Sequence, residues 1–335
     1  MSDPVYDMIA IGNALVDVLA HATDEFLGEQ EKLHGMRRGA MSLIDERRAV
    51  ELYADMGEAI ESSGGSAANT MAGFASFGGN GAFIGKVAQD QLGGVFAHDM
   101  RAMGLYYKTT PLVVGSPTGR CLILVTPDGQ RTMNTFLGAS IEMGPDDIDE
   151  HLIASSKITY LEGYLYDDPK AKEAFKLGAQ IAHDAGHRVA LTLSDPFCVE
   201  RHRDDFRYLV AEHTDILFAN EQEIISLYDT ETFEQAYKQV MNKCEVAVLT
   251  RGEKGAVIVS KDGLVMIEAE PVERVVDTTG AGDQFAAGFL FGFTRNMSLE
   301  MCGKLGAMAA AEVISHMGPR PEINYSDLLK KAAAA

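Results

Sequence analysis

The sequence has little cysteine and no long apolar run. Its four cysteines, Cys121, Cys198, Cys244 and Cys302, lie far apart and form no C-x-x-C pair, which disfavours zinc and disulfide scaffolds. No apolar run approaches the ~20 residues that a membrane-spanning helix requires. The N-terminus shows no basic region followed by a cleavable apolar stretch. We therefore expect a cytoplasmic protein with reduced thiols and no membrane anchor.

Basic side chains are scarce relative to acidic ones. The chain has 29 Lys and Arg against 49 Asp and Glu, which gives a formal net charge of −20 at pH 7. Such a surface repels the phosphates of nucleic acids and of anionic membranes, so neither is expected as a partner. A bound phosphate group must then be held by local devices such as backbone N–H groups, an arginine or a metal ion.

The chain does contain enough apolar residues for a large core, since they make up 46% of its 335 residues. Runs typical of buried parallel strands occupy residues 6–11, 82–87, 158–161, 189–193, 216–219, 246–250 and 256–259. Helical stretches fall between them at residues 66–77, 91–103, 170–185, 221–227 and 233–242. This alternation predicts a doubly wound, mostly parallel α/β sheet in a single domain over residues 1–335.

Two regions interrupt the alternation. The first contains short extended segments at residues 16–22 and 35–44. The second contains strands at residues 106–114, 120–125 and 131–136, separated by Pro- and Gly-containing turns. We predict that residues of about 14–45 and 105–137 form a small β-sheet that stands off the main domain as a lid.

The strongest chemical signal is the run from Asp277 to Asp283, with the sequence DTTGAGD. Three small residues, Gly280, Ala281 and Gly282, precede an aspartate where a helix begins, so their N–H groups can converge on an anion. Asp283 would repel a phosphate if the site only bound anions. It is well placed as a base that takes a proton from a substrate hydroxyl during phosphoryl transfer. The alternative is a glycine-rich helix cap.

Two further motifs place polar groups next to glycines. In the segment 64–69, adjacent glycines precede a helix whose first turn carries Ser66 and Asn69 on one face. In the segment 12–17, a strand ends at Gly-Asn, and Asp17 follows four residues after Asn13. Both can present polar groups to a polyhydroxylated ligand at the carboxyl end of a strand. A flexible capped loop and a solvated turn are the respective alternatives.

Two other segments suit a nucleotide and its metal. Glu223 follows the strand at 216–219 by a few residues, where a carboxylate can organise Mg²⁺ through water. An acidic first helical turn explains the same pattern. The segment 250–255 has the sequence TRGEKG and resembles a strand end followed by a turn that could border a nucleotide.

Together, the glycine pair at 64–69 and the run from Asp277 to Gly288 resemble the two signatures of the PfkB carbohydrate-kinase family, which has a ribokinase-like fold. The segments 12–17, 193–197 and 215–221 are most similar to those of adenosine kinases within that family. The resemblance covers the chain from Gly12 to about Pro319.

The resemblance implies a role for each matching residue. Asp283 would be the catalytic base, Gly280 to Gly282 the anion hole, and Arg131, on the lid, a contact of the transferred phosphate. The hydroxyls of the acceptor would be held by Asn13, Asp17, Gly65, Ser66 and Asn69. ATP would be bordered by Asn220, Thr250, Gly252 and Gly255. Glu223 would lie in the water shell of Mg²⁺, and Asp277 and Thr279 would be candidate ligands of a monovalent cation such as K⁺.

The acceptor predicted from the resemblance is a nucleoside, adenosine, phosphorylated by ATP on its primary hydroxyl. An apolar slot for the base could come from Tyr164, Leu165, Phe197, Phe136 and Leu15. Adenosine kinases often have a phenylalanine pair where this chain has Tyr164 and Leu165. A glutamine found in some of them has no match near Met41. The alternatives are a PfkB-type kinase of a free sugar or sugar acid, and an inactive regulator that binds a nucleoside or sugar. We expect a monomer or a homodimer.

Overall fold

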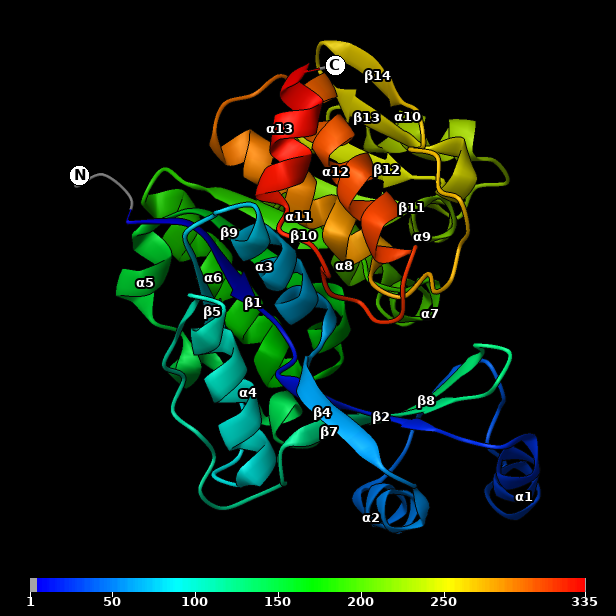
Figure 1. Cartoon of the computed structure of the whole chain (residues 1–335). Helices are drawn as coiled ribbons and strands as arrows, with labels where there is room; N and C mark the ends of the chain where they lie inside the picture. Colours follow the sequence, from blue (N-terminus) through cyan, green and yellow to red (C-terminus); the bar gives the residue numbers. More distant parts are fainter. Residues whose placement is uncertain (1–4, 335) are drawn as a thin grey trace.

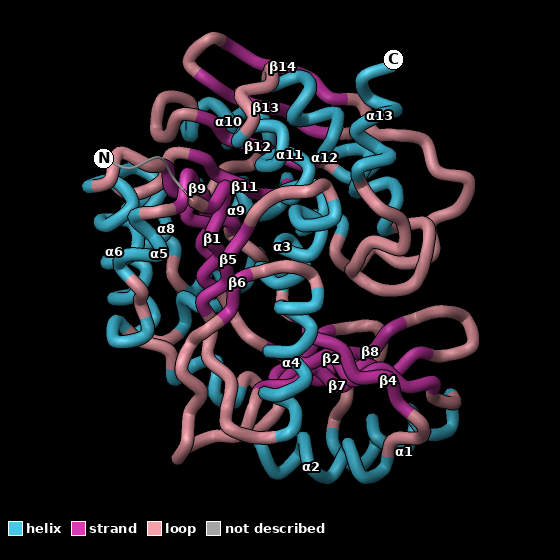
Figure 2. The backbone as a smooth tube through the Cα atoms, turned by 60° about the vertical axis from the view of Figure 1, so that its left-hand side comes forward, coloured by secondary structure: helices cyan, strands magenta, loops and turns pink. Residues whose placement is uncertain are grey.

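The computed structural model describes residues 5–334. A nine-stranded sheet forms its centre, in the order β14-β13-β12-β11-β10-β9-β1-β5-β6 (Figures 1 and 2). The strands are β1 (Tyr6–Ile11), β5 (Gly81–Ile84), β6 (Tyr106–Tyr107), β9 (Ser156–Glu162), β10 (Arg188–Thr192), β11 (Ile216–Asn220), β12 (Val246–Thr250), β13 (Ala256–Ser260) and β14 (Gly263–Ile267). Every pairing from β6 to β12 is parallel, which confirms the predicted sheet.

Helices cover both faces of this sheet, and the apolar strands explain why. Met8 and Ala10 of β1 pack into the core on one face, while Ile9 and Ile11 pack on the other. The first face is covered by α3 (Ser66–Ser76), α4 (Gln91–Ala102), α11 (Ala281–Thr294), α12 (Leu299–Val313) and α13 (Ser326–Ala334). The second is covered by α5 (Glu150–Ala154), α6 (Pro169–Asp184), α7 (Pro196–Arg201), α8 (Arg203–Glu212), α9 (Glu221–Tyr228) and α10 (Phe233–Val240). Short 3-10 turns are η1 (Gly138–Glu142), η2 (Pro145–Asp147), η3 (Gly163–Asp167) and η4 (Gly252–Lys254).

A second sheet of five strands stands below the first in Figure 1, in the order β3-β8-β7-β2-β4. Its strands are β2 (Leu15–His21), β3 (Met41–Leu43), β4 (Ala59–Gly64), β7 (Gly119–Val125) and β8 (Arg131–Phe136). The helices α1 (Asp24–His34) and α2 (Glu46–Asp55) cover the face away from the large sheet, where Leu27 and Leu52 pack on Leu122. The opposite face carries Cys121, Ile123 and Val125.

Three details of the strand assignment were wrong. Residues 106–107 extend the large sheet beside β5 and do not belong to the small one. The strand β13 pairs antiparallel with β12 although its apolar run was interpreted as a parallel strand. The edge strand β4, with the polar sequence AIESSG, was not predicted because it lacks the apolar alternation of a half-buried strand.

The two sheets are joined where the polar motifs lie. The chain leaves β1 at Ile11 and enters β2 at Leu15, and it leaves β4 at Gly64 and enters α3 at Ser66. Between the latter two, Gly65 has φ = 98°, and a Cβ there would collide with the carbonyl oxygen of Asn13. The fold thus requires glycine at position 65 and brings the segments 12–17 and 64–69 together. Within residues 5–334, no helix has the length and apolarity needed to cross a bilayer.

Candidate active site

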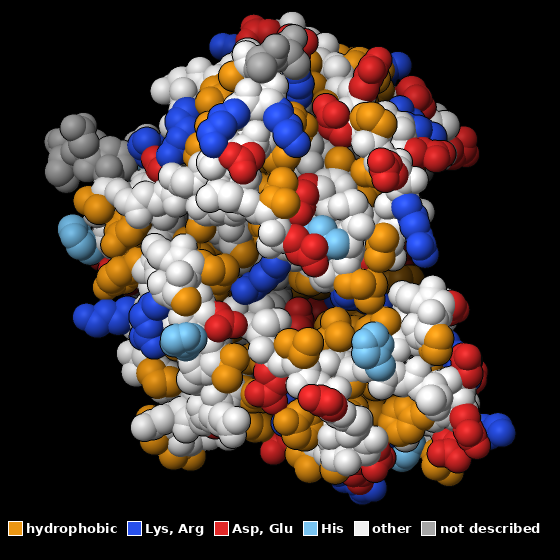
Figure 3. Space-filling model, viewed as in Figure 1, with side chains coloured by type: hydrophobic (Ala, Val, Ile, Leu, Met, Phe, Trp, Pro, Cys, Tyr) orange, Lys and Arg blue, Asp and Glu red, His pale blue; other side chains and the backbone are white. Residues whose placement is uncertain are grey.

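The space-filling surface is hollowed between the large part of the molecule and the small sheet (Figure 3). The carboxyl ends of the parallel strands meet this region, which is where ligands bind in open α/β sheets. Asp283 lies in the first turn of α11. Its Oδ1 accepts a hydrogen bond from Ser66 Oγ at 2.6 Å, and its Oδ2 accepts one from Asn69 Nδ2 at 3.4 Å. Two of the predicted segments, more than 200 residues apart, therefore converge on one carboxylate.

The surroundings of Asp283 suit a general base. Burial raises the pKa of its carboxyl to about 6, although the hydrogen bonds from Ser66 and Asn69 oppose this rise. A carboxyl with that pKa is ionised at pH 7 but holds a proton more strongly than an ordinary aspartate. Asp283 can therefore accept a proton from a nearby hydroxyl at neutral pH.

The turn before Asp283 has the backbone geometry of a helix start that can face an anion. Gly280 is the N-cap of α11, with φ = 80°, and a Cβ there would crowd Pro319. The N–H of Ala281 donates to the carbonyl of Thr278 at 3.3 Å. The amides of Gly282 and Asp283 then remain as first-turn donors without an intrahelical acceptor. A Cβ at Gly282 would meet no atom within 4 Å, so the space beside it is open to a ligand.

Asn13 is buried, and a residue that the sequence analysis missed holds it. Its Nδ2 donates to Glu162 Oε1 at 2.7 Å, while Glu162 Oε2 accepts from the N–H of Ala67 at 2.8 Å. Glu162 therefore ties the loop after β1 to the first turn of α3. Burial raises the pKa of Glu162 to about 7. Its position at the carboxyl end of β9 was the one available sequence signal.

Asp17 and Asn69 share a second missed residue, Arg320. The carboxyl of Asp17 lies over Gly64, where a Cβ would collide with it. Burial raises the pKa of Asp17 to about 6, and the charges of Arg320 and Arg131 oppose that rise. Arg320 Nε also donates to Asn69 Oδ1 at 3.2 Å. No motif marked Arg320, which lies beyond the run from Asp277 to Gly288.

Arg131 reaches from β8 of the small sheet to the large part of the molecule. Its Nη2 lies 2.9 Å from Asp277 Oδ2, and both side chains are buried. Asp277 also accepts from the amides of Thr279 at 3.0 Å and Gly318 at 2.9 Å. Within residues 5–334, Arg131 Nε and Nη1 have no hydrogen-bond partner. The sequence analysis named Asp277 as a candidate ligand of a monovalent cation and Arg131 as a contact of the transferred phosphate. The structure pairs these two residues.

A cavity of about 530 Å³ adjoins the start of α11. Its wall includes Thr250, Gly252 and Gly255, three of the four residues predicted to border ATP, as well as Ala281 and Gly282. The rest of the wall is mostly apolar, with Val272, Val275, Phe285, Ala307, Ala310 and Ile314 among its members. An apolar slot that opens on free backbone N–H groups suits a nucleotide base and its phosphates.

Asn220, the fourth of those residues, does not line this cavity. It forms a capping box with Glu223, whose carboxylate accepts from Asn220 Nδ2 at 2.6 Å and from the Asn220 N–H at 2.9 Å. Burial, together with the charges of Asp195 and Asp283, raises the pKa of Glu223 to about 7. Among residues 5–334, no group of three or more His, Cys, Asp or Glu is arranged to bind a metal directly.

Of the five residues proposed for a base slot, Leu15 is buried at 7% exposure and Phe136 is partly buried against the core. The other three divide into two kinds. Phe197 on α7 is 69% exposed, and Tyr164 is half-buried with its N–H bonded to Ser194 Oγ at 3.2 Å. Leu165, by contrast, is only 1% exposed and packs in the core on the second face of the large sheet. Leu165 was therefore wrongly placed in the slot.

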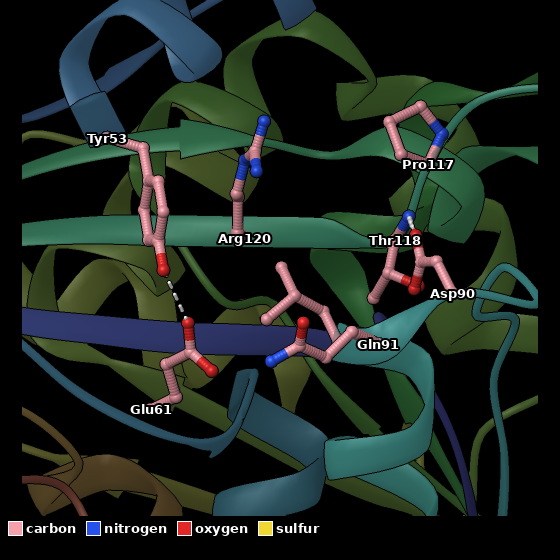
Figure 4. A pocket seen from close by; sticks show the side chains of 8 residues that line it. Tyr53, Glu61, Asp90, Gln91, Pro117, Thr118 and Arg120 are labelled. Atoms are coloured by element: carbon pink, nitrogen blue, oxygen red, sulfur yellow. Dashed lines mark hydrogen bonds between the residues drawn. The ribbon is translucent and has the colours of Figure 1, made fainter.

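A second hollow, of about 230 Å³, lies between α2, β4, β7 and the start of α4 (Figure 4). Tyr53 donates to Glu61 at 2.9 Å there, and Arg120 lies across the Tyr53 ring, 5.8 Å from its centroid. None of the predicted site residues lines it. We place the candidate active site in the cleft around Asp283.

Three comparisons with known proteins show what this chain is similar to. The family described as pfkB family carbohydrate kinase matches residues 41–324. The structure of an adenosine kinase from Sinorhizobium meliloti is 50% identical, with a TM-score of 0.90 over 98% of this chain and 99% of its own. That of a probable sugar kinase from Rhizobium etli CFN 42 is 47% identical, with a TM-score of 0.91 over 99% and 100%. An adenosine kinase from Saccharomyces cerevisiae is 28% identical over 95% of this chain and 98% of its own.

Proposed function

The chain belongs to the pfkB family of carbohydrate kinases, and we propose that it transfers the γ-phosphoryl group of ATP to the primary hydroxyl of a nucleoside, adenosine. The family makes it a phosphotransferase with an alcohol group as acceptor. The observation that carries the proposal is the convergence of Ser66 and Asn69 on Asp283, beside the open amides of α11 and a nucleotide-sized cavity.

In the proposed reaction, Asp283 removes the proton from the acceptor hydroxyl while the hydroxyl oxygen attacks the γ-phosphorus. The bond from the γ-phosphorus to the bridging oxygen breaks, and ADP leaves with that oxygen. Ser66 and Asn69 hold the carboxylate in place. The amides of Gly282 and Asp283 face the negative charge that spreads over the phosphoryl oxygens in the transition state. Asn13 and Asp17 orient the acceptor through its other hydroxyls.

Arg131 brings a positive charge to this site from the small sheet. Its Nη2 forms an ion pair with Asp277, and its Nε and Nη1 have no hydrogen-bond partner within residues 5–334. We expect it to share its charge between Asp277 and the transferred phosphoryl group when ATP is bound. Because Arg131 is on β8, this contact would also bring the small sheet over the substrates as a lid.

The carboxylates near Glu223 fit a magnesium ion that is bound through water. The charges of Asp195 and Asp283 both raise the pKa of Glu223, so each of them repels the Glu223 carboxylate. A divalent cation relieves such repulsion, and oxygen ligands with several waters are what Mg²⁺ prefers. When bound with ATP, Mg²⁺ supplies charge neutralisation at the phosphates. A cation such as K⁺ near Asp277 and Thr279 is supported by the family resemblance alone.

The nucleoside acceptor is supported by the exposed ring of Phe197 and by adenosine kinases among the relatives. The test is an acceptor panel in which ATP consumption is measured with adenosine, inosine, guanosine, ribose, fructose and a keto-deoxy sugar acid. We expect adenosine to give the highest kcat/KM. A free sugar that exceeds every nucleoside supports the sugar-kinase alternative, to which the probable sugar kinase from Rhizobium etli also points. Binding without turnover for every acceptor indicates a regulator.

A further inference from the structure

Arg320 belongs to a short segment after α12 that is anchored to the proposed catalytic machinery at three successive residues. The N–H of Gly318 donates to Asp277 Oδ2 at 2.9 Å, and the carbonyl of Pro319 accepts from Gln284 Nε2 at 2.9 Å. Arg320 Nε then donates to Asn69 Oδ1 at 3.2 Å. A segment held at each residue places its guanidinium group with little freedom.

The position of Arg320 determines which way the amide of Asn69 faces. An arginine can only donate hydrogen bonds, and an ionised aspartate can only accept them. Asn69 lies between the two, since its Oδ1 meets Arg320 and its Nδ2 meets Asp283. Only this orientation satisfies both neighbours. A rotated amide would turn its oxygen toward the carboxylate of Asp283 and its nitrogen toward a cation.

Arg320 also acts on Asp17, which lies on the small sheet. Asp17 and Asp99 are the two carboxylates whose charges oppose the lowering of the Arg320 pKa by burial. Asp99 accepts a hydrogen bond from the N–H of Ser63 at 2.8 Å. Arg320 Nη2 is buried and has no hydrogen-bond partner within residues 5–334. Arg320 Nη1 donates to Met103 Sδ at 3.7 Å. The guanidinium therefore keeps one buried donor without a partner in the described chain, and Asp17 is a carboxylate that its charge reaches.

We infer that Arg320 is a positioning residue of the acceptor site, which orients the Asn69 amide toward Asp283 and places a positive charge near Asp17. The inference rests on the proposed roles of Asp283 and Asp17. It assigns Arg320 two separable effects. The hydrogen bond to Asn69 acts on the base and so on kcat. The positive charge acts on Asp17 and so on acceptor binding.

The experiment compares Arg320→Met, which removes charge and donors, with Arg320→Lys, which keeps the charge but loses the planar guanidinium. We measure kcat, acceptor KM and ATP KM from pH 5 to pH 8.5, with calorimetric binding of the acceptor as a readout independent of turnover. In Arg320→Met, we expect acceptor KM to rise about tenfold and kcat to fall several-fold, with ATP KM within twofold of the unmodified enzyme. In Arg320→Lys, kcat should fall while acceptor binding is retained.

The pH profile separates this role from a purely structural one. The groups facing Asp17 are Arg320, Arg131, Asp283 and Cys121. Loss of the Arg320 cation leaves the carboxylate less stabilised, so acceptor binding should begin to weaken at a higher pH as the pH falls. Arg320→Met should therefore shift the acidic side of the acceptor-binding profile to higher pH. Arg320→Lys should leave it in place.

Two further variants complete the design. Asn69→Ala combined with Arg320→Met should give the same kcat as Asn69→Ala alone within a factor of two, because Arg320 acts on the base through Asn69. Arg188→Met is the matched control, since it removes an arginine paired with Glu245 at the opposite end of β10. Its kinetics should be unchanged.

The inference is overturned if Arg320→Met leaves unchanged both the acceptor KM and the pH below which acceptor binding weakens. It is also overturned if the double variant loses kcat by the full product of the losses in Arg320→Met and Asn69→Ala. If Arg320→Met does not fold, Arg320→Lys with an unchanged kcat contradicts the role assigned to the Asn69 bond. All variants are measured with whichever acceptor the panel identifies. A sugar acceptor would refute the adenosine proposal, while the same profiles still decide the role of Arg320.

Discussion

Replacement of Asp283 by asparagine should lower kcat but raise the free energy of unfolding at neutral pH. Asparagine keeps the size of the side chain and can still accept from Ser66, but it cannot take a proton. General bases contribute about 10²–10⁴-fold, so kcat should fall at least about 100-fold, with a small change in acceptor KM. ATP consumption at saturating acceptor measures this effect.

The same substitution should stabilise the fold at neutral pH. The pKa of Asp283 is raised from 3.8 to about 6 by burial, a shift equivalent to at most about 3 kcal/mol at 1.36 kcal/mol per unit. The side chain is partly accessible to water, so we expect a gain of about 1–2 kcal/mol in the free energy of unfolding. For a chain of this length that corresponds to a rise of about 1–3 °C in Tm.

The effect of the Asp283 charge on the free energy of unfolding should depend on pH. Below about pH 4 the carboxyl is protonated in both the folded and the unfolded chain, so it costs nothing. Between pH 4 and 6, the Asp283 carboxyl loses its proton in the unfolded chain before it does so in the folded chain. The free energy of unfolding therefore falls as the pH rises, and this decrease is complete above about pH 6. The variant should therefore exceed the unmodified enzyme in urea denaturation at pH 7.5 and match it near pH 4.

A matched control is Asp128→Asn in the β7–β8 turn. The hydrogen bond from Thr126 lowers the pKa of Asp128, so its removal should not stabilise the fold. If Asp283→Asn keeps more than a tenth of kcat, Asp283 is not the base. If it is destabilised at pH 7.5 as much as at pH 4, the argument from burial is wrong.

Four other substitutions test the remaining parts of the site. Arg131→Ala should lower kcat/KM for ATP by about 10²-fold or more, since it removes the cation shared between Asp277 and the phosphoryl group; unchanged kcat/KM would exclude that role. Glu223→Gln should raise the Mg²⁺ concentration for half-maximal rate, and an unchanged value would mean that Glu223 only caps its helix. Gly282→Val should leave Tm nearly unchanged and lower kcat, because a Cβ at position 282 meets only the open space beside the amides of Gly282 and Asp283. A fall in Tm that accompanies the fall in kcat indicates a folding defect. Phe197→Ala should weaken adenosine binding in calorimetry by about 1–3 kcal/mol without changing ATP binding, and equal effects on both ligands would contradict the base slot.

The sequence by itself determined the features that depend on local pattern. Buried parallel strands are apolar on both faces, so β1, β9, β10, β11 and β12 were recognisable from composition alone. The sequence marked the glycines at 65 and 280 within the two site motifs, and both have positive φ values in the structure. Asp283 was identifiable for the same reason, because it follows such a glycine at a helix start.

Only the tertiary structure decided which distant groups meet. Arg131 and Asp277 lie 146 positions apart, and their pairing depends on how the small sheet sits over the start of α11. Glu162 and Arg320 carry no motif, since a lone carboxylate after a strand or an arginine after a helix is common on any surface. Strand order likewise depends on edges such as β4 and β6, whose short or polar sequences carry no periodicity. Local periodicity records which residues are buried, whereas contacts across a fold depend on packing that no single segment encodes.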